Sequence, residues 1–454
     1  MFVNRLCEFC ASTEYEDLPA QVIENTKNAI IDTHGVIFTG YKEPVADLLI
    51  DWVKDQSMKT SATILGYELK TSESLAALVN GVMGHAIDFD DVHSGLRGHP
   101  SIPIYSAILA VAEAEKKTGK ELITAFSVGV EIMTKLGSYV NPSHVVKGWH
   151  PTATLGVIGV ASAIGKLYSF TQAEFKQVFG LATSMMSGLK LNFGTMTKPF
   201  HIGYCAKNGI EAAQLVKRGF TACEDTFTPK TGVFDLFTDE EVKEFWGEDL
   251  GKPWSLIDPG FNVKRYPCCY ATHRFADAAL ILSQTNQFKL EDIERIECVA
   301  AVGSYVPLIY NRPKSGVEGK FSLEYVIAAM LQDQKLSVQS FTDEMVNRAV
   351  IQELLKKVFL SEDETIKENR PVGDIGYIEL IIHTNEKAYK ETIFHAKGSS
   401  KQPLSQTDLK EKFFDCLSRE EFTSEANTSY QQLRDLENIS DITQLFPFSV
   451  TKEE

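Results

Sequence analysis

One short stretch of the sequence, GHAIDFDDVHSGLRGHPSIP from Gly84 to Pro103, concentrates side chains that transfer protons. It holds three aspartates, three histidines and an arginine. An imidazole titrates near neutral pH and a carboxylate can orient it, so this combination suits general acid/base chemistry. The flanking segments, LAALVNGVMG and IPIYSAILAVAEA, are apolar enough to be core helices. A charged cluster between buried helices predicts a functional site rather than a solvated loop.

Two of the histidines have a local sequence that predicts where they lie. His99 and His150 each precede a proline. The residue before a proline favours extended backbone, so we expect each histidine at the N-terminal end of a helix. Free N–H groups and the helix dipole favour a bound anion at such an end. Two such ends facing one pocket would form a carboxylate site.

Lysines that could complete this site lie in similar contexts. Lys198 (MTKPFHIG) and Lys264 (FNVKRYPCCYATH) each stand at a break before a helix, with His201 and His273 a turn or more beyond. Loop positions held by a rigid scaffold are favoured for catalysis. Taken singly, each residue also has a structural interpretation, as a capped histidine, a solvated lysine or, for the aspartates of the opening stretch, a turn residue.

The elements that must position these residues change character along the chain. Apolar periodicity predicts helices over 102–117, 121–139, 152–167 and 200–218, several of them apolar nearly all round, as in the middle of a bundle. Thr171 to Glu174 (TQAE) is a capping box that opens a further helix. After about residue 255 the pattern predicts an α+β module. Its expected strands are 295–302, 377–384 and one from 389, with helices over 322–331 and 343–358. The end of the chain returns to helix.

Composition excludes several classes of protein. The chain has 454 residues, 44% of them hydrophobic and 23% charged, which is typical of a globular protein of two or three domains. Its net charge of −16 argues against nucleic acid or an anionic membrane as a partner. The longest apolar runs are too short for a transmembrane helix.

Eight cysteines are scattered through the chain, and no secretory leader is evident. This pattern predicts reduced thiols in a cytoplasm. Cys7 and Cys10 form a lone C-x-x-C on an expected helix, without a second pair at zinc-site spacing. We therefore expect no metal there.

Five motifs in order make the chain resemble the MmgE/PrpD family, which includes 2-methylcitrate dehydratase, cis-aconitate decarboxylase and iminodisuccinate epimerase. They are GHAIDFDDVH with GHPS, KGWHPTATLG, TKPFHIGYCA, VKRYPCCYATH and YNRP, and they cover about residues 80 to 313. The resemblance implies a mainly α fold with a large all-helical domain and a smaller α+β lid domain. The expected bounds are 1–260 for the first part of the helical domain, 261–398 for the lid, and 399–454 for helices that rejoin the helical domain.

The same resemblance implies a homodimer that acts on a small di- or tricarboxylate with neither a metal nor an organic cofactor. Carried over by motif, the active-site positions are Asp88, His99, His150, Lys198, Lys264 and Tyr310. We expect His99 to be the general acid/base, with Asp88 orienting it and Tyr310 donating a proton. Lys198, Lys264 and His150 are expected to bind substrate carboxylates, with His93, His201 and His273 as further candidates for substrate binding.

One departure from the decarboxylase pattern affects the expected substrate. A threonine follows the D-F-D-D stretch in that pattern, whereas this chain has Val92, which can neither donate nor accept a side-chain hydrogen bond. We expect a dehydratase- or decarboxylase-like lyase. An epimerase, with His93 as a second acid/base, and a carboxylate-binding or scaffold homologue without turnover remain alternatives.

Overall fold

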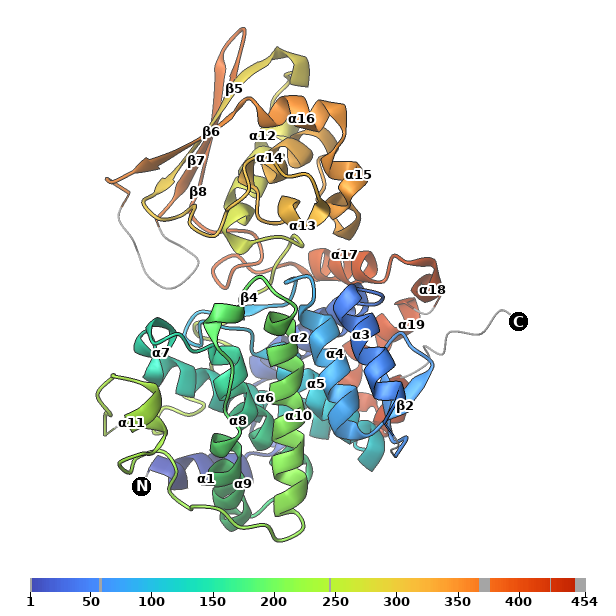
Figure 1. Ribbon diagram of the computed structural model, residues 1–454, viewed down its shortest axis with the longest axis vertical. Coiled ribbons are helices and arrows are strands. Elements are labelled where there is room, and N and C mark those ends of the chain that lie inside the picture. The colour runs from blue at the N-terminus through green and yellow to red at the C-terminus, as the bar shows by residue number, and fades with distance from the viewer. Residues whose placement is uncertain (1, 57–58, 245, 367–375, 425, 446–454) are drawn as a thin grey trace. The chain divides into compact units, whose positions relative to one another are not determined.

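The chain forms two compact units in the computed structural model (Figure 1). The structure describes residues 2–56, 59–244, 246–366, 376–424 and 426–445. A helical unit comprises residues 1–261 and 409–454, and an α+β unit comprises residues 262–408. The fold is therefore mainly α with a smaller α+β part, as the sequence predicts.

The helical unit is built from helices of very different length. Their bounds are α1 (Phe2–Ser12), α2 (Ala20–Thr39), α3 (Pro44–Lys54), α4 (Glu73–His85), α5 (Ser101–Glu115), α6 (Gly119–Val140), α7 (Ser143–Val146), α8 (Pro151–Leu167), α9 (Gln172–Ser184), α10 (Thr197–Val216) and α11 (Val233–Phe237). Short strands β1 (Ala62–Ile64) and β2 (Leu69–Thr71) pair as an antiparallel ribbon. The strand β3 (Val92–His93) lies between α4 and α5 in sequence. The capping box at Thr171 and Glu174 opens α9 as predicted.

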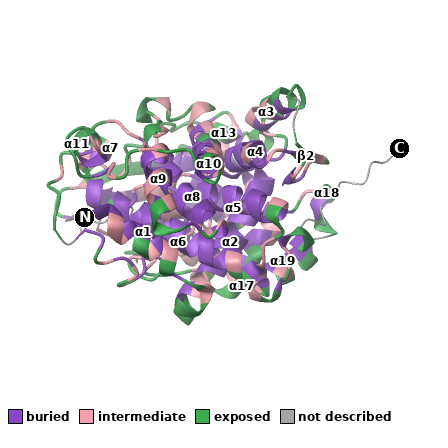
Figure 2. Cartoon of the chain, turned by 90° about the horizontal axis from the view of Figure 1, so that it is seen from below, coloured by how far each residue is buried: buried purple, intermediate pink, exposed green. Residues whose placement is uncertain are grey.

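Helices α5 and α8 form the interior of this unit, where Figure 2 colours them as buried. Every residue of α5 from Ser101 to Glu113 is buried, and so is every residue of α8 except Lys166. Helices that are apolar on all sides belong inside a bundle. This confirms the sequence-based expectation for the two segments.

Glycines let α10 approach α4 closely. A Cβ atom on Gly203 of α10 would lie 2.0 Å from the carbonyl oxygen of Leu78, and one on Gly81 of α4 would lie 2.8 Å from the Cα of Gly203. No side chain fits between backbones at such distances. The contact brings the C-terminal end of α4 alongside the N-terminal end of α10.

The last helices, α17 (Gln406–Cys416), α18 (Glu420–Thr423) and α19 (Ala426–Arg434), follow the α+β unit in sequence. From Leu409 onward they belong to the helical unit. The buried ammonium of Lys412 lies 2.6 Å from Oδ1 of Asp32 on α2, and Arg434 pairs with Glu24 on the same helix at 2.9 Å. These ion pairs connect α17 and α19 to α2.

The α+β unit carries one four-stranded sheet in the order β6-β5-β7-β8. The strands are β5 (Ile293–Ala301), β6 (Val358–Asp363), β7 (Ile378–Thr384) and β8 (Ala388–Ile393). Strand β5 runs parallel to β6 and antiparallel to β7, which pairs antiparallel with β8. Three of these strands were predicted from the sequence.

One face of this sheet is buried by helices (Figure 1). Alternate residues of β5 and β7, among them Cys298 and Leu380, pack with α12 (His273–Thr285), α14 (Leu323–Asp333) and α16 (Ala349–Leu355). Short helices α13 (Gly316–Gly319) and α15 (Asp343–Val346) complete the unit. The helix predicted over 343–358 is wrong in part, because it breaks between α15 and α16 and its last residue begins β6. The short strand after α16 carries no periodicity that separates it from a helix end.

The cysteines and the described helices agree with two further expectations. All eight cysteines are free thiols, and burial raises the pKa of Cys7 on α1 to about 12. Among the residues that the structure describes, no helix is long and apolar enough to cross a bilayer.

Candidate active site

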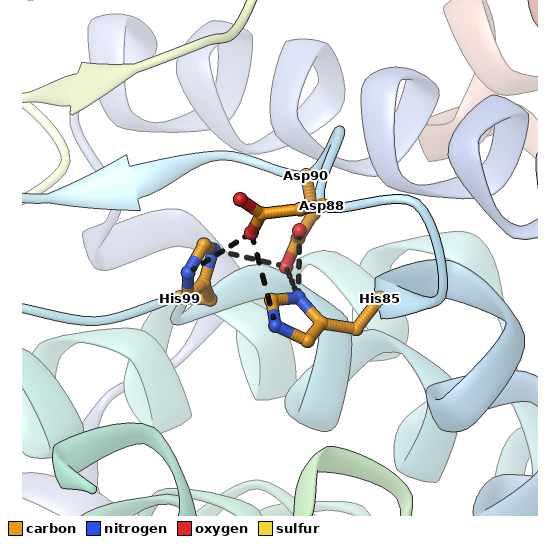
Figure 3. A group of neighbouring side chains, drawn as sticks. All are labelled: His85, Asp88, Asp90 and His99. Atoms are coloured by element: carbon orange, nitrogen blue, oxygen red, sulfur yellow. Dashed lines mark hydrogen bonds and ion pairs between the residues drawn. The ribbon is translucent and has the colours of Figure 1, made fainter. Parts of the chain in front are cut away.

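Two histidines share one buried aspartate at the centre of the Gly84–Pro103 stretch (Figure 3). Nδ1 of His85, the last residue of α4, lies 2.8 Å from Oδ1 of Asp90. Nδ1 of His99 lies 3.1 Å from Oδ2 of the same carboxylate and 2.9 Å from the carbonyl oxygen of Asp91. A carbonyl oxygen only accepts hydrogen bonds, so His99 carries its proton on Nδ1 and leaves a lone pair on Nε2.

The carboxylate of Asp88 faces the Nε2 atoms of the two imidazoles. Its Oδ1 atom is 3.8 Å from Nε2 of His99, 3.9 Å from Nε2 of His85 and 3.0 Å from Nζ of Lys198 in the first turn of α10. The backbone of Asp88 has a φ of 58°, a left-handed conformation that costs most residues energy and that aspartate tolerates. Strained backbone of this kind often marks functional sites.

The beginning of α8 adjoins that of α5. The backbone N–H of His99 donates to Oγ1 of Thr152 at 2.9 Å, and His150 is the N-cap residue of α8. Nδ1 of His150 lies 3.2 Å from Nδ1 of His201, one turn into α10. The structure thus places His99 and His150 at the starts of two adjacent helices, in the arrangement that the prolines predict.

The protonation of the aspartates follows from their surroundings. Burial alone would raise the pKa of Asp90, but the charges of His85 and His99 and their hydrogen bonds outweigh it and hold this pKa well below its usual range. Burial raises the pKa of Asp91 to about 8, with Asp32 and Asp90 acting in the same direction and the hydrogen bond from Ser101 opposing them. At neutral pH Asp90 is therefore ionised and Asp91 is mostly protonated.

His85, His150 and His201 are neutral at pH 7. Burial lowers the pKa of His85 to about 4, against the attraction of Asp90. Burial also lowers the pKa of His150 well below its usual value, and the charge of Lys198 acts in the same direction. Burial lowers the pKa of His201 as well. Neutral imidazoles can accept a proton, which is the state that a general base requires.

The side chains of Figure 3 bring nitrogen and oxygen atoms to within 4.8 Å of one another, close enough to invite comparison with a cation site. Their bonding fits acid/base groups better than metal ligands. Nδ1 of His85 is directed at Asp90, Nδ1 of His99 is shared between the carbonyl oxygen of Asp91 and Asp90, and the ammonium of Lys198 already pairs with Asp88. These atoms are already engaged in hydrogen bonds and an ion pair, so we treat the members of the cluster as proton-transfer groups.

His93 has the contacts of a turn histidine. It is 1% exposed, its Nδ1 accepts the backbone N–H of Leu96 at 3.2 Å, and its ring lies edge-on to Phe261. Burial lowers its pKa to about 4. These contacts give His93 a structural role within the turn, and a role in substrate binding stays a prediction.

Three of the expected site residues belong to the α+β unit. Lys264 is 2% exposed and follows β4 (Phe261–Asn262), whereas Tyr310 is 37% exposed in the segment between β5 and α13. His273 begins α12 with its ring between Tyr266 and Tyr270, and its Nε2 is 3.3 Å from the carbonyl oxygen of Cys268. His273 thus has the contacts of a buried helix-start residue, and the roles of all three in catalysis stay predictions.

Sequence reasoning missed two residues of this site, His85 and Asp90. Both belong to the stretch that drew attention first, but neither stands before a proline or at the start of a helix. The available signal was their separation of five residues across a helix end, which lets the two side chains meet.

The site and the fold together define a class: a mainly α protein with a smaller α+β unit, and an acid/base cluster where three helices of the helical unit meet. The MmgE/PrpD N-terminal domain matches residues 4–245, and the MmgE/PrpD C-terminal domain matches residues 266–437. The chain therefore belongs to the MmgE/PrpD family.

Curated relatives cover nearly the whole chain. The chain is 31% identical to a cis-aconitate decarboxylase of Mus musculus over 442 residues, which span 93% of this chain and 89% of the relative. It is 32% identical to the cis-aconitate decarboxylase of Homo sapiens, over 87% of this chain and 83% of the relative. A cis-aconitate decarboxylase of Aspergillus terreus is 25% identical over 83% of this chain and 81% of the relative.

Proposed function

We propose that this protein is a lyase that removes carbon dioxide or water from a small di- or tricarboxylate by acid/base catalysis with its own side chains. The observation that carries the proposal is the convergence of His99 and Lys198 on Asp88 at the starts of α5 and α10. An acid/base group beside a fixed cation is what a reaction through a carbanion next to a carboxylate needs. The curated relatives, all decarboxylases by name, favour this class.

In the proposed reaction Lys198 binds a carboxylate of the substrate and His99 handles the proton. For decarboxylation, the bond to the leaving carboxylate breaks and its electron pair stays on carbon. A proton from Nε2 of protonated His99 then forms the new C–H bond. For dehydration, neutral His99 removes a proton from carbon and the hydroxyl leaves as water with a proton from a second donor. In both reactions negative charge develops on the substrate next to Lys198, so the attraction between the ammonium and the substrate is stronger in the transition state.

His150 and Lys264 are proposed to bind further carboxylates, and Tyr310 to donate a proton. His201 is proposed to orient His150 through their 3.2 Å contact. The roles of Lys264 and Tyr310 rest on the family motifs. We also propose a homodimer, which light scattering of the purified protein would test.

Proton NMR of the purified protein in heavy water tests the reaction. The panel is 2-methylcitrate, citrate, cis-aconitate, and the imine formed from oxaloacetate and ammonia. New vinyl signals would establish a lyase and identify its substrate. Deuterium entering an unchanged carbon skeleton would favour an epimerase instead. Thermal stabilisation by citrate without turnover of any compound would favour a carboxylate-binding homologue.

His99→Ala tests the central assignment. Acid/base assistance typically contributes about 100- to 10,000-fold in rate, so turnover should fall by that order. Near-normal turnover by this variant would remove His99 from the mechanism.

A further inference from the structure

Nε2 of His85 is a buried nitrogen that faces the carboxylate of Asp88. The side chain of His85 is fully buried, and its Nδ1 is satisfied by Asp90. Among the described residues its Nε2 has no hydrogen-bond partner. Leaving a buried polar atom unpaired costs about 1–3 kcal/mol, and an asparagine could donate to Asp90 without leaving an imidazole nitrogen unpaired.

The unpaired nitrogen points at the groups that the proposed reaction uses. The ring centroids of His85 and His99 are 4.5 Å apart, and the ring planes make an angle of 68°. Both have Nδ1 at Asp90 and both have Nε2 within 4 Å of Oδ1 of Asp88, as Figure 3 shows. Asp90 is ionised and accepts from both Nδ1 atoms, so both Nε2 atoms carry lone pairs in the neutral state. The Nε2 lone pairs of His85 and His99 and the carboxylate of Asp88 are three proton acceptors that face one another, and they can share one proton.

The net charge of the groups around His85 also favours one bound proton. The groups that face His85 are Asp88 and Asp90 from its own loop, His99 before α5, Lys198 from α10 and, more distantly, His150 before α8. Two carboxylates face a single ammonium, so the set carries one excess negative charge when the imidazoles are neutral. One proton on the imidazole pair neutralises it.

We infer that His85 is a proton-accepting positioning residue that acts through His99, with which it exchanges a proton across the carboxylate of Asp88. This inference deepens the proposed function and rests on it. The transfer breaks the N–H bond of one imidazolium, leaves the electron pair on that nitrogen, and forms an O–H bond on Asp88. This O–H bond then breaks, its electron pair stays on oxygen, and an N–H bond forms on the other Nε2. The step is a proton transfer without oxidation or reduction, and it needs no further reactant.

Substrate binding supplies the movement that the transfer needs. Asp88 is held by Lys198 at 3.0 Å, and its distances to the two Nε2 atoms exceed hydrogen-bonding range by about 1 Å. A substrate carboxylate that takes over Lys198 releases Asp88 toward the imidazoles. His85 would then reload or unload His99.

The variant His85→Asn tests the inference, because its amide retains a donor for Asp90 and lacks the Nε2 acceptor. We expect kcat to fall about 10- to 100-fold with KM changed less than about 3-fold, since proton transfer and not binding is impaired. The acid limb of the pH profile should move to higher pH, because His99 then receives the proton without competition. The matched control is His34→Asn, at a buried histidine of α2 whose Nδ1 is 2.8 Å from the hydroxyl of Tyr105. A parental kcat and pH profile in His85→Asn would overturn the inference.

A second measurement needs no substrate and separates this inference from the proposed function. Exchange of the imidazole C2 hydrogen with deuterium, followed by mass spectrometry at a series of pH values, reports the titration of each histidine. We expect His85→Asn to shift the exchange midpoint of His99, and His99→Gln to shift that of His85, because the two imidazoles share Asp90 and both face Asp88. If His85→Asn does not fold, His99→Gln still decides the question. Unchanged midpoints would overturn the inference, whereas coupled midpoints without turnover of any carboxylate would overturn only the proposed function.

Discussion

Nζ of Lys198 lies 3.0 Å from Oδ1 of Asp88, although the two residues are 110 positions apart in sequence. This ion pair joins the first turn of α10 to the strained residue that follows α4. In the proposed reaction a substrate carboxylate competes with Asp88 for the same ammonium. Binding of substrate is thereby linked to the position of the carboxylate that faces both imidazoles.

Replacing Lys198 by methionine should weaken substrate binding. A hydrogen bond to a charged group contributes about 1.5–3 kcal/mol, so we expect KM to rise about 10- to 100-fold, with a further loss in kcat because the carbanion loses its cation. Steady-state kinetics measure both. Lys207→Met is the matched control, because Lys207 lies on the same helix and pairs with Glu211 rather than with the site. A normal KM in Lys198→Met would contradict the assigned role.

Replacing Lys412 by methionine should lower stability and disturb the loop that carries Asp88 and Asp90. The Nζ atom of Lys412 donates to the carbonyl oxygen of Phe89 at 3.0 Å and pairs with Asp32 at 2.6 Å. Removing one partner of a buried ion pair costs about 3–5 kcal/mol, which denaturant unfolding would measure. Adding Asp32→Asn should restore part of this stability, but kcat should stay low because the loop between Asp88 and Asp90 has lost its donor.

Lys27→Met provides the comparison for Lys412→Met. Lys27 is also a mostly buried lysine of the helical unit and pairs with Glu437 at 2.9 Å, but it does not contact the Asp88–Asp91 loop. We expect it to lower stability and leave kcat unchanged. Full turnover in the double variant Asp32→Asn/Lys412→Met would show that Lys412 supports folding alone.

Asp91→Asn should change how stability depends on pH. The pKa of Asp91 is raised from 3.8 to about 8 by burial, so the folded state favours the protonated carboxyl. That contribution is fully present below about pH 4 and is lost as the pH rises through about 8. The neutral amide does not titrate. Melting temperatures between pH 5 and pH 9 should therefore fall less for Asp91→Asn than for the parent, and parallel curves would contradict the raised pKa.

Gly203→Ala should separate α4 from α10. The added Cβ would lie 2.0 Å from the carbonyl oxygen of Leu78, so the helices must move apart, at a cost of about 1–3 kcal/mol. Because Lys198 and Asp88 lie at the ends of these two helices, we expect a higher KM as well. Lys207→Ala on the same helix is the control. Unchanged stability and KM would show that the helices accommodate the extra methyl group.

Much of the local structure could be predicted because it depends on neighbours in sequence. A residue before a proline favours extended backbone, so His99 and His150 were expected just before a helix, and Pro100 is the N-cap residue of α5 while Pro151 is the first residue of α8. Three of the four strands of the sheet, β5, β7 and β8, were predicted from residues that favour strands, and the capping box of α9 was predicted from Thr171 and Glu174 alone.

Only the tertiary structure decided which helix ends come together to form the site. Hydrophobic periodicity specifies which face of a helix is buried but not which helix covers it. The approach of α10 to α4 at Gly203 and Gly81, the sharing of Asp90 by two imidazoles, and the contact of Lys412 with a loop 323 residues earlier all depend on packing. By itself the sequence determined the family motifs and the histidines at helix starts. Packing over long sequence distances added His85, Asp90 and Lys412, because steric fit and charge balance between distant segments are properties of the folded chain.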